Sequence, residues 1–480
     1  MPRNASSDTI AAVASARGTG GIGIIRLSGP EALKILRAVF RRGGGSLTEF
    51  TPRRLEYGWV LDAFGQALDE VMAVYLPGPH SFSGEDTAEI HCHGGLALVE
   101  AVLESVLRRG ARPAGPGEFT RRAFLNGRLD LSQAEAVAEI ISAPTLQGIH
   151  LARNKLEGFL GARLEELRLK LESLRARLCL ALDFPEESVS PEEELEEQRA
   201  FREALEEIRS CLRGLVQSCE QARLWREGAR VVLAGEVNTG KSSLFNALLG
   251  RPRALVSDLP GTTRDFIEES LNLRGMPVRL SDTAGLRPAP ESEDRPLPDE
   301  VEKAGLELTA ELCRQADLIL LVLEARPLPP SRDPPALLSA LGIPSVLPLP
   351  PAILLARNKA DLFPEKNPPE EISGFPCLSV SARTGQGTDK LRSLLYELLS
   401  KRAGSLDFEQ AAPPSIRQKI IISGVLEELD ALALDYGQGI PAEILSSRLE
   451  SAAESLAEII GMSCREEVLD QVFSKFCVGK

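Results

Sequence analysis

The sequence predicts a multidomain protein of combined α/β and all-α class, with an α/β domain inserted into a helical bundle. A glycine-rich loop at 235–242 lies between an apolar run and a helical stretch. Apolar runs alternate with helical stretches from about 228 to 400, which favours a largely parallel sheet. Amphipathic helical stretches of matching character occur before and after this region, and they indicate one bundle interrupted by an insertion.

Length and composition set the broad class. The 480 residues correspond to about three domains, and the hydrophobic (43%) and charged (26%) content is ordinary for a globular protein. No apolar run reaches ~18 residues and the first residues lack the apolar core of a signal peptide, so we expect no membrane span and a cytoplasmic location. The eight cysteines form no CxxC pair, and neither a zinc ribbon nor a disulfide framework is expected. Because the net charge is −14, contact with RNA should use a local basic patch or a partner.

The first domain is predicted at 1–125 and has mixed α/β character. Strands are expected at 23–27 and 69–76, and helices at 30–40 and 96–107. Three of the four histidines fall within 14 residues of this domain: His80, His91 and His93. His91 and His93 would share one face of a strand, but no third or fourth ligand is apparent, so a metal site is the weaker alternative.

The second domain is predicted to be helical and discontinuous, formed by 126–225 together with 405–480. Its first part carries leucines at intervals of three and four residues: Leu164, Leu167, Leu171, Leu174 and Leu178. Such stripes are more often bundle core than a partner site.

The inserted domain is predicted at 228–400. Its strands are expected at 230–234, 278–281, 317–323 and 352–356. Two proline-rich stretches, 288–298 and 327–351, are predicted to be surface loops.

The loop at 235–242 fits the phosphate-binding pattern G-x-x-x-x-G-K-[ST]. Its glycines let backbone N–H groups surround phosphate oxygens, and the N-terminus of the following helix adds its positive end. We expect Lys241 to reach the outer phosphates of a nucleotide and Ser242 to hold Mg²⁺.

A second motif selects the base. Asn358-Lys359-Ala360-Asp361 follows an apolar strand, and the Asp361 carboxylate can accept hydrogen bonds from the N1–H and 2-amino groups of guanine, a donor pair that adenine lacks. A backbone N–H of Ser381-Ala382-Arg383 could donate to the guanine oxygen. The sequence therefore predicts a GTP site.

Two further motifs would sense the terminal phosphate. In Asp282-Thr283-Ala284-Gly285, Asp282 would support Mg²⁺ through water and the Gly285 N–H would contact the phosphate. Thr262 and Thr263 supply the threonine of the first switch segment. The predicted GTP-binding residues are Asn238, Thr239, Gly240, Lys241, Ser242, Ser243, Ser257, Thr262, Thr263, Asp282, Thr283, Ala284, Gly285, Asn358, Lys359, Asp361, Ser381, Ala382 and Arg383.

The catalytic glutamine of Ras-type GTPases is absent. Gly285 is followed by Leu286-Arg287-Pro288, so another group must orient the attacking water, or hydrolysis is slow.

Motifs spread over nearly the whole chain carry a family resemblance. They lie at 21–29, 81–86, 93–95, 116–119, 122–126, 261–265, 282–287 and 476–480, together with the asparagine-containing phosphate loop. This set resembles the MnmE (TrmE) family of tRNA-modification GTPases. The terminal Phe476-Cys477-Val478-Gly479-Lys480 after a P-loop GTPase is its most specific part. The loop departs from the family's P-N-A-G-K-S at Val237 and Thr239.

The resemblance implies a tetrahydrofolate-binding-like N-terminal domain that also forms a homodimer. A 5-formyl-tetrahydrofolate-type one-carbon donor would be held by residues matching Arg26, Glu89, Arg128 and Lys480. Arg128 stands where some relatives have lysine, with the charge kept. Cys477 would be a catalytic thiol near this site, although from the residues alone a small structural residue near a chain end is an equal alternative.

The resemblance also implies a potassium-dependent G domain that dimerises across its active site. Potassium would be held by residues matching Asn238, Ser257, Leu259 and Thr262, and magnesium by Ser242 and Thr263. A glutamate matching Glu302 would replace the missing glutamine, although 288–298 is an insertion before it.

Together these features predict a GTP hydrolase that acts in tRNA modification. With a flavin-bearing (FAD) partner resembling MnmG (GidA), in a heterotetramer, it would form carboxymethylaminomethyl or aminomethyl groups at carbon 5 of the wobble uridine, position 34. Whether glycine or ammonium is the second substrate stays open. The alternatives are a regulatory GTPase switch in RNA or ribosome assembly without chemistry of its own, and a folate enzyme regulated by GTP.

Overall fold

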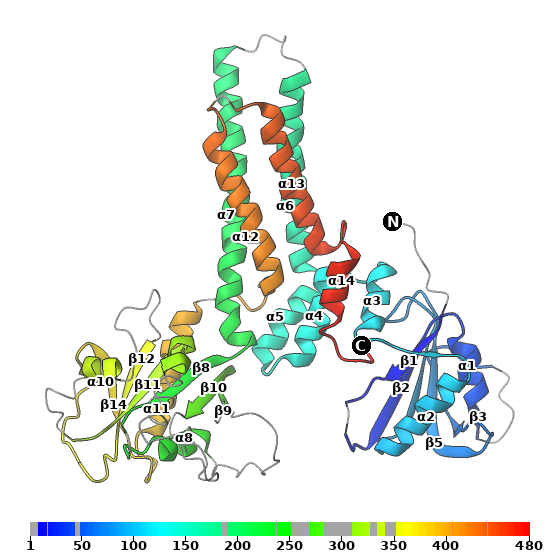
Figure 1. Cartoon of the computed structure of the whole chain (residues 1–480), viewed down its shortest axis with the longest axis horizontal. Coiled ribbons are helices and arrows are strands. Elements are labelled where there is room, and N and C mark those ends of the chain that lie inside the picture. Colours follow the sequence, from blue (N-terminus) through cyan, green and yellow to red (C-terminus); the bar gives the residue numbers. More distant parts are fainter. Residues whose placement is uncertain are drawn as a thin grey trace, which may run out of the picture. The chain divides into compact units, whose positions relative to one another are not determined.

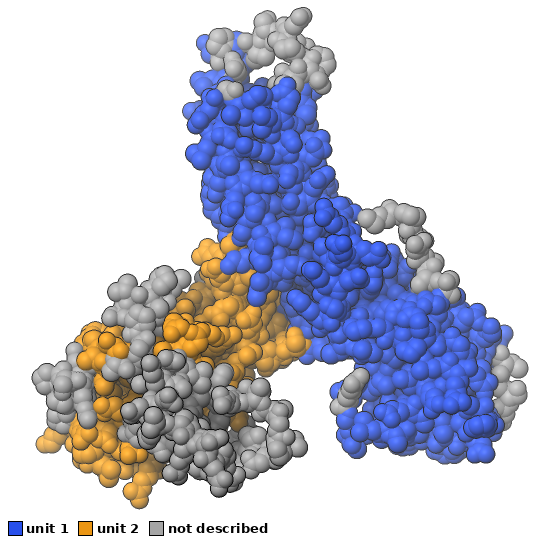
Figure 2. All heavy atoms as spheres, viewed as in Figure 1, with its two compact units in different colours: residues 1–141, 152–215, 414–480 blue, residues 142–151, 216–413 orange. Residues whose placement is uncertain are grey.

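The computed structural model describes residues 8–16, 18–43, 49–183, 190–236, 238–250, 268–282, 310–326, 334–340, 352–404, 406–438 and 440–480. The chain divides into two compact units, shown in different colours in Figure 2. The first comprises 1–141, 152–215 and 414–480, and the second comprises 142–151 and 216–413. The boundaries predicted above for three domains stay predictions.

The first unit begins with a seven-stranded sheet of order β3-β4-β5-β6-β2-β1-β7 (Figure 1). All its neighbouring strands are antiparallel except β1 and β7. The strands are β1 (Ile10–Val13), β2 (Ile22–Ser28), β3 (Phe40–Arg42), β4 (Glu56–Leu61), β5 (Ala67–Leu76), β6 (Thr87–His93) and β7 (Arg112–Pro113). The strands and helices predicted at 23–27, 30–40, 69–76 and 96–107 are confirmed by β2, α1, β5 and α2.

Helices α1 (Ala32–Val39) and α2 (Leu96–Arg108) cover one face of this sheet. Side chains alternate between faces along a strand, so Ile25 and Leu27 of β2 join Val71 and Ile90 in the core beneath these helices. Gly23 is required where α2 approaches, because a Cβ there would lie 2.4 Å from Cγ2 of Val99.

The opposite face of the sheet is only partly covered. Helix α3 (Glu118–Leu125) places Phe119 against Ile10 and Ala12. Farther along, the strand register aligns Tyr57 with Met72, Met72 with His91, and His91 with Ile24. Tyr57 and Met72 are exposed, and this row lies on the face that α1 and α2 do not cover.

Long helices form the rest of the first unit. Helices α6, α7, α12 and α13 run side by side (Figure 1), and the leucine stripe of α6 is buried, which confirms that it is bundle core. Helices α5 and α7 contribute residues to both units. The helices are α4 (Leu131–Ser142), α5 (Leu146–Leu156), α6 (Phe159–Asp183), α7 (Pro191–Arg226), α12 (Ile416–Asp435), α13 (Ala442–Ile460) and α14 (Glu466–Phe473).

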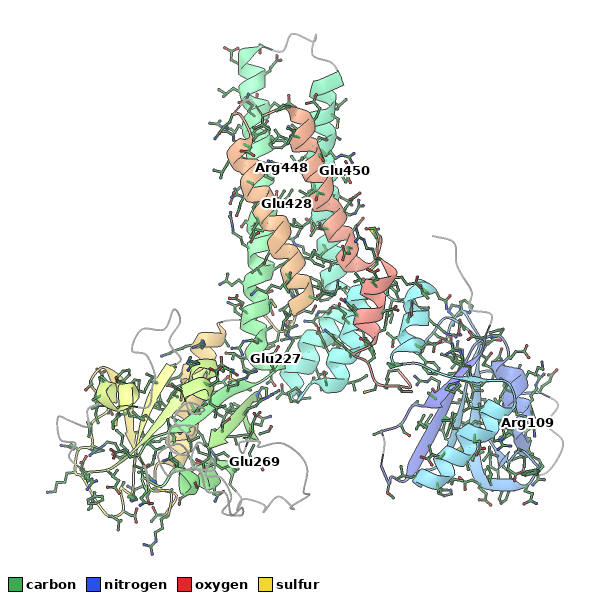
Figure 3. All side chains as sticks on the ribbon, viewed as in Figure 1. Arg109, Glu227, Glu269, Glu428, Arg448 and Glu450 are labelled. Atoms are coloured by element: carbon green, nitrogen blue, oxygen red, sulfur yellow. The ribbon has the colours of Figure 1, made fainter. Side chains whose placement is uncertain are left out.

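Ion pairs tie neighbouring bundle helices together at the surface. Arg448 and Glu450, labelled in Figure 3, both project from α13. Arg448 Nη1 lies 2.6 Å from Asp435 Oδ2, and Glu450 Oε1 lies 2.9 Å from Arg175 Nη2. Such exposed pairs contribute at most about 1 kcal/mol each, so the leucine core dominates bundle stability.

The second unit is built on a sheet of order β13-β14-β12-β11-β8-β10-β9. Strands β14, β12, β11, β8 and β10 are parallel, as predicted, and β13 and β9 are antiparallel edge strands. Helices α8 (Lys241–Leu249) and α11 (Thr388–Ala403) cover one face. The strands are β8 (Ala229–Ala234), β9 (Glu268–Leu273), β10 (Met276–Asp282), β11 (Leu318–Glu324), β12 (Ala352–Asn358), β13 (Glu371–Ile372) and β14 (Phe375–Ser379).

One loop prediction is wrong in part. Within the proline-rich stretch 327–351, residues Pro334–Ala340 form helix α10, and Leu338 packs into the core on the second face of the sheet. Proline is tolerated in the first turn of a helix because the N–H it lacks would have no intrahelical partner there. The other proline-rich stretch, 288–298, lies outside the described residues.

Two absences expected from the sequence can be compared with the structure. No helix among the described residues is long and apolar enough to cross a membrane. All eight cysteines are free thiols.

Candidate functional sites

The phosphate loop connects the end of β8 to the first turn of α8. Its backbone is tightly enclosed: Gly240 has φ +87°, and a Cβ there would lie 2.4 Å from Nδ2 of Asn358. Lys241 Nζ donates to the carbonyl oxygens of Gly235 (2.9 Å) and Glu236 (2.7 Å). Burial lowers the pKa of Lys241. The ammonium group is therefore held inside the loop, where a nucleotide phosphate can replace the carbonyl oxygens as its partner.

Ser242 and Asp282, the two described residues expected to support Mg²⁺, lie side by side. Ser242 Oγ donates to Asp282 Oδ2 at 2.7 Å, and Asp282 is buried at the end of β10. A hydroxyl and a carboxylate are hard oxygen donors of the kind Mg²⁺ prefers. The proximity of these two side chains is therefore compatible with Mg²⁺.

Asn358 joins three segments of the nucleotide site. Its Nδ2 donates to the carbonyl oxygens of Thr239 (2.9 Å) and Gly240 (3.3 Å), and its Oδ1 accepts from the N–H of Ala382 (3.0 Å). The side chain is 2% exposed. Asn358 thus acts as a scaffold that fixes the phosphate loop relative to the 381–383 segment.

Asp361 is oriented by a residue whose side-chain role the sequence did not reveal. Ser381 Oγ donates to Asp361 Oδ1 at 2.7 Å, and Ser381 is fully buried. Lys359, with φ +66°, is held by an ion pair of 2.6 Å to Glu324 at the end of β11. Glu324 was also missed, because only the parallel pairing of β11 and β12 brings residues 35 positions apart together.

Several predicted residues lie outside the described part of the chain. They are Ser257, Leu259, Thr262, Thr263, Thr283, Ala284, Gly285 and Glu302. Asn238 is described: it is exposed and has φ +67°. Ser243 and Arg383 are exposed at the site's margin.

In the first unit, two of the four predicted folate residues form a pair. Arg26 and Glu89 are register partners in β2 and β6, and Arg26 Nε lies 2.9 Å from Glu89 Oε1. They lie on the face of the sheet that α1 and α2 leave uncovered. The Arg26 guanidinium also lies 5.7 Å from the ring centroid of Phe82 and 5.9 Å from that of Phe119.

Arg128 borders the loop that carries Phe82. A Cβ on Gly84, whose φ is +80°, would lie 3.2 Å from Cγ of Arg128. The Arg128 side chain is exposed. Arg26 and Arg128 therefore both border the 81–86 loop.

The C-terminal tail packs on the N-terminal sheet. Val478 forms a β-bridge with Pro116, and the Gly117 N–H donates to Cys477 O at 3.4 Å. Gly479 has φ +96°, and a Cβ there would lie 2.1 Å from Val13 O. Val13 lies on β1 and pairs with Ile25 of β2, the residue before Arg26. Gly479 therefore packs beside this strand pair, and Lys480 is the next residue of the tail.

The histidine pair does not form a metal centre. His91 Nε2 lies 3.2 Å from Glu89 Oε2, whereas His93 Nδ1 lies 2.8 Å from Asp69 Oδ1. Among the described residues, no group of three or more histidine, cysteine, aspartate or glutamate side chains could hold a metal ion.

An ion cluster centred on the buried Arg122 lines a cavity of about 440 Å³ beside α3 and α14. Arg122 donates to Asp8, Glu85 and Glu118 at 2.8–3.1 Å. Burial alone would raise the pKa values of Asp8 and Glu118, but hydrogen bonds from Arg112 and Arg122 outweigh it and lower both. The sequence did not reveal this cluster, although Glu85 and Arg122 lie in motifs that carried the family resemblance.

The sheet order, the phosphate loop and the Asn358–Asp361 segment define a P-loop GTPase. The model of the MnmE helical domain matches residues 131–477, and that of the GTP-binding protein TrmE N-terminus matches 9–128. The chain belongs to the MnmE family of tRNA modification GTPases.

Full-length relatives support this membership. The tRNA modification GTPase MnmE of Nitratidesulfovibrio vulgaris (strain DP4) is 45% identical over 98% of this chain and 99% of its own length. The protein of the same name from Lawsonia intracellularis is 41% identical over 98% of this chain and 100% of its own. The crystal structure of the G domain of the T. maritima FeoB iron transporter is 25% identical and covers 37% of this chain and 99% of that one. Its TM-score of 0.25 is too low to support an argument.

Proposed function

We propose that this chain is a GTP hydrolase that acts with a flavin-bearing partner to modify tRNA. The pair would form carboxymethylaminomethyl or aminomethyl groups at carbon 5 of the wobble uridine, position 34. The observation that carries the proposal is the 45% identity over the whole length to a tRNA modification GTPase. It is supported by two groups of polar side chains in the one chain, Ser381 with Asp361 and Arg26 with Glu89.

The nucleotide part of the proposal uses GTP and Mg²⁺. Asp361, oriented by Ser381, would accept from the guanine donor pair, and Ser242 with Asp282 would place Mg²⁺. We further propose that Asn238 helps to hold K⁺ when two G domains meet, with Ser257, Leu259 and Thr262. Glu302 would orient the attacking water.

Potassium dependence has a direct test. GTP turnover by the full chain should be several-fold faster in KCl than in NaCl at equal ionic strength, because the proposed ligands at the dimer contact would fit the larger K⁺ better than Na⁺, which carries the same charge. Equal rates would contradict the Asn238 proposal. Unchanged turnover of Glu302→Ala in KCl would contradict the role of Glu302.

The second site would hold a 5-formyl-tetrahydrofolate-type one-carbon donor. Arg26 and Glu89 lie among apolar and aromatic side chains, the usual composition of a small-molecule site. Arg128 and Lys480 would contribute positive charge toward the donor's carboxylates. The packed tail would present Cys477, whose side chain is exposed, beside this site.

The assembly is proposed to be a homodimer that joins a flavoprotein resembling MnmG in a heterotetramer in the cytoplasm. Exposed apolar side chains, including Tyr57 and Met72, lie on the open sheet face beside Glu89. A second copy of the chain would cover the part of this face that carries Tyr57 and Met72. With a net charge of −14, the chain would leave much of the tRNA contact to the partner.

The experiment that tests the function is mass spectrometry of tRNA nucleosides from cells that lack the gene. The deletion should remove the modified wobble uridine, and the wild-type gene should restore it. A deletion strain with unchanged wobble uridines would contradict the proposal and favour a regulatory GTPase.

A further inference from the structure

Three polar side chains form a connected group on the open face of the N-terminal sheet. Arg26 Nε contacts Glu89 Oε1 at 2.9 Å, and His91 Nε2 contacts Glu89 Oε2 at 3.2 Å. Both carboxylate oxygens of Glu89 are thus engaged by side chains that carry or can carry positive charge. The three side chains are 19%, 17% and 27% exposed, so they are reachable from outside but partly shielded from water.

The surroundings of this group are apolar. His91 is aligned with Met72 on one side and Ile24 on the other, and Glu89 is aligned with Val74. The rings of Phe82 and Phe119 lie over Arg26. A few convergent polar groups inside an apolar and aromatic frame are typical of a site for a flat heterocyclic ligand.

We propose that His91 is a further ligand-positioning residue of this site, and that its protonation weakens binding of a 2-amino-4-oxopteridine ligand. The inference rests on the proposed one-carbon-donor site. It adds a titratable residue that controls the acceptor strength of Glu89.

The competition for Glu89 follows from the hydrogen-bond donors along one edge of the ligand's ring. A 2-amino-4-oxopteridine presents a ring N–H beside a 2-amino group, the same donor pair that guanine presents to a carboxylate. A carboxylate oxygen accepts from the ligand more strongly when no charged donor competes for it. Arg26 engages Glu89 Oε1 at every pH, so the difference between pH values arises at Oε2. An imidazolium makes a charge-assisted hydrogen bond, roughly twice as strong as a neutral one. Protonated His91 would therefore compete with the ligand for Glu89 Oε2.

Few other groups near His91 can account for such a pH effect. Arg26 faces it across Glu89 and stays charged. On the β4–β5 side, Glu70 hydrogen bonds to Tyr57. His93, two residues along β6, contacts Asp69 rather than Glu89. Among the described residues of this cluster, His91 is consequently the imidazole that contacts Glu89.

The test measures the affinity of the full-length protein for 5-formyltetrahydrofolate by isothermal titration calorimetry. We expect wild-type affinity to fall at least about threefold between about pH 8 and about pH 6, the range over which imidazoles gain a proton. His91→Gln keeps a neutral side chain of similar length and should lose most of this dependence. His93→Gln is the matched control and should behave like the wild type. Thermal unfolding of each variant checks that it folds.

The outcomes separate this inference from the function it rests on. Wild-type binding that weakens in acid and becomes pH-independent in His91→Gln supports the proposal. Equal pH dependence in the wild type and His91→Gln, or pH-independent wild-type binding, overturns the role of His91 but leaves the donor site intact. Absence of wild-type binding at every pH, or full binding by Glu89→Ala, overturns the donor site and the role of His91 together.

Discussion

The nucleotide site and the polar group on the N-terminal sheet differ in how the chain brings their residues together. At the nucleotide site, the carboxyl ends of β8, β10 and β12 meet at one edge of a parallel sheet, and each delivers a short motif of consecutive residues. On the N-terminal sheet, Arg26 meets Glu89 across 63 positions only through antiparallel register.

This difference determines what a single substitution can do. A backbone-built loop tolerates no added side chain where it is closely packed, because the neighbouring segment cannot move. A site made of side chains on a rigid sheet can lose one group and keep its frame. We therefore expect glycine substitutions in the loop to be more severe than side-chain truncations on the sheet.

The largest effect is expected for Gly240→Ala. Its Cβ would lie 2.4 Å from Asn358 Nδ2, at φ +87°, so the loop must shift away from Asn358. We expect GTP affinity to fall by more than about 100-fold, since strain and a lost scaffold contact together cost roughly 3 kcal/mol or more. Fluorescent GTP-analogue titration measures this.

The matched control is Gly437→Ala. That glycine has the same φ of +87°, but its Cβ would meet only the flexible end of Arg202. It should change GTP affinity by less than twofold, roughly within measurement error. Equal losses in both variants would show that backbone strain, rather than closure of the nucleotide loop, causes the effect.

Next in size is a change of base preference in Asp361→Asn. The amide donates where the carboxylate accepts, so it no longer matches the guanine donor pair but can donate to the 2-oxo group of xanthine. We expect the ratio of GTP to XTP affinity to fall by about 100-fold or more. Competition binding with the two nucleotides measures the ratio, and an unchanged ratio would mean that another group reads the base.

On the sheet side, Gly479→Ala should reduce tRNA modification without reducing GTP hydrolysis. Its Cβ would lie 2.1 Å from Val13 O, so the tail must leave its position beside β1. We expect wobble-uridine modification to fall about tenfold, because misplacement of catalytic groups by about 1 Å can cost more than that, while GTP hydrolysis is retained. Gly110→Ala has open space around its Cβ and should retain both activities.

The smallest effect concerns acid stability of the first unit. The folded pKa values of Asp8 and Glu118 are lowered, so their contribution to stability is present above their unfolded pKa values and is lost as pH falls below about 4. Glu118→Gln should reduce the free energy of unfolding at neutral pH by about 1–2 kcal/mol and flatten the acid decline. Thermal unfolding between about pH 7 and about pH 3 measures both.

The control for this prediction is Glu104→Gln, which removes the exposed pair with Arg108. Surface pairs of this type are worth about 0.5 kcal/mol or less. A steeper acid decline in Glu118→Gln than in the wild type would contradict the account of the cluster.

The two regions also differ in what the sequence could predict. Asn358, Asp361 and Ser242 were predicted because each lies in a short motif next to an apolar strand. Ser381 appeared in a motif, but the role of its hydroxyl required the geometry of the folded loop. Arg26 and Glu89 were named only through family resemblance, and their pairing was not predicted, since antiparallel register cannot be deduced from spacing. The helix at 334–340 was missed because the prolines at its start are typical of a loop.

GTP hydrolysis and a separate ligand site in this one chain are both proposed to serve tRNA modification. The most direct test of this proposal combines GTP turnover in KCl with mass spectrometry of wobble uridines in cells that carry Gly240→Ala or Glu89→Ala. Both variants should lose the modified uridine, but only Gly240→Ala should lose GTP turnover. Full modification in cells carrying Glu89→Ala, or retained modification without GTP turnover, would contradict the account.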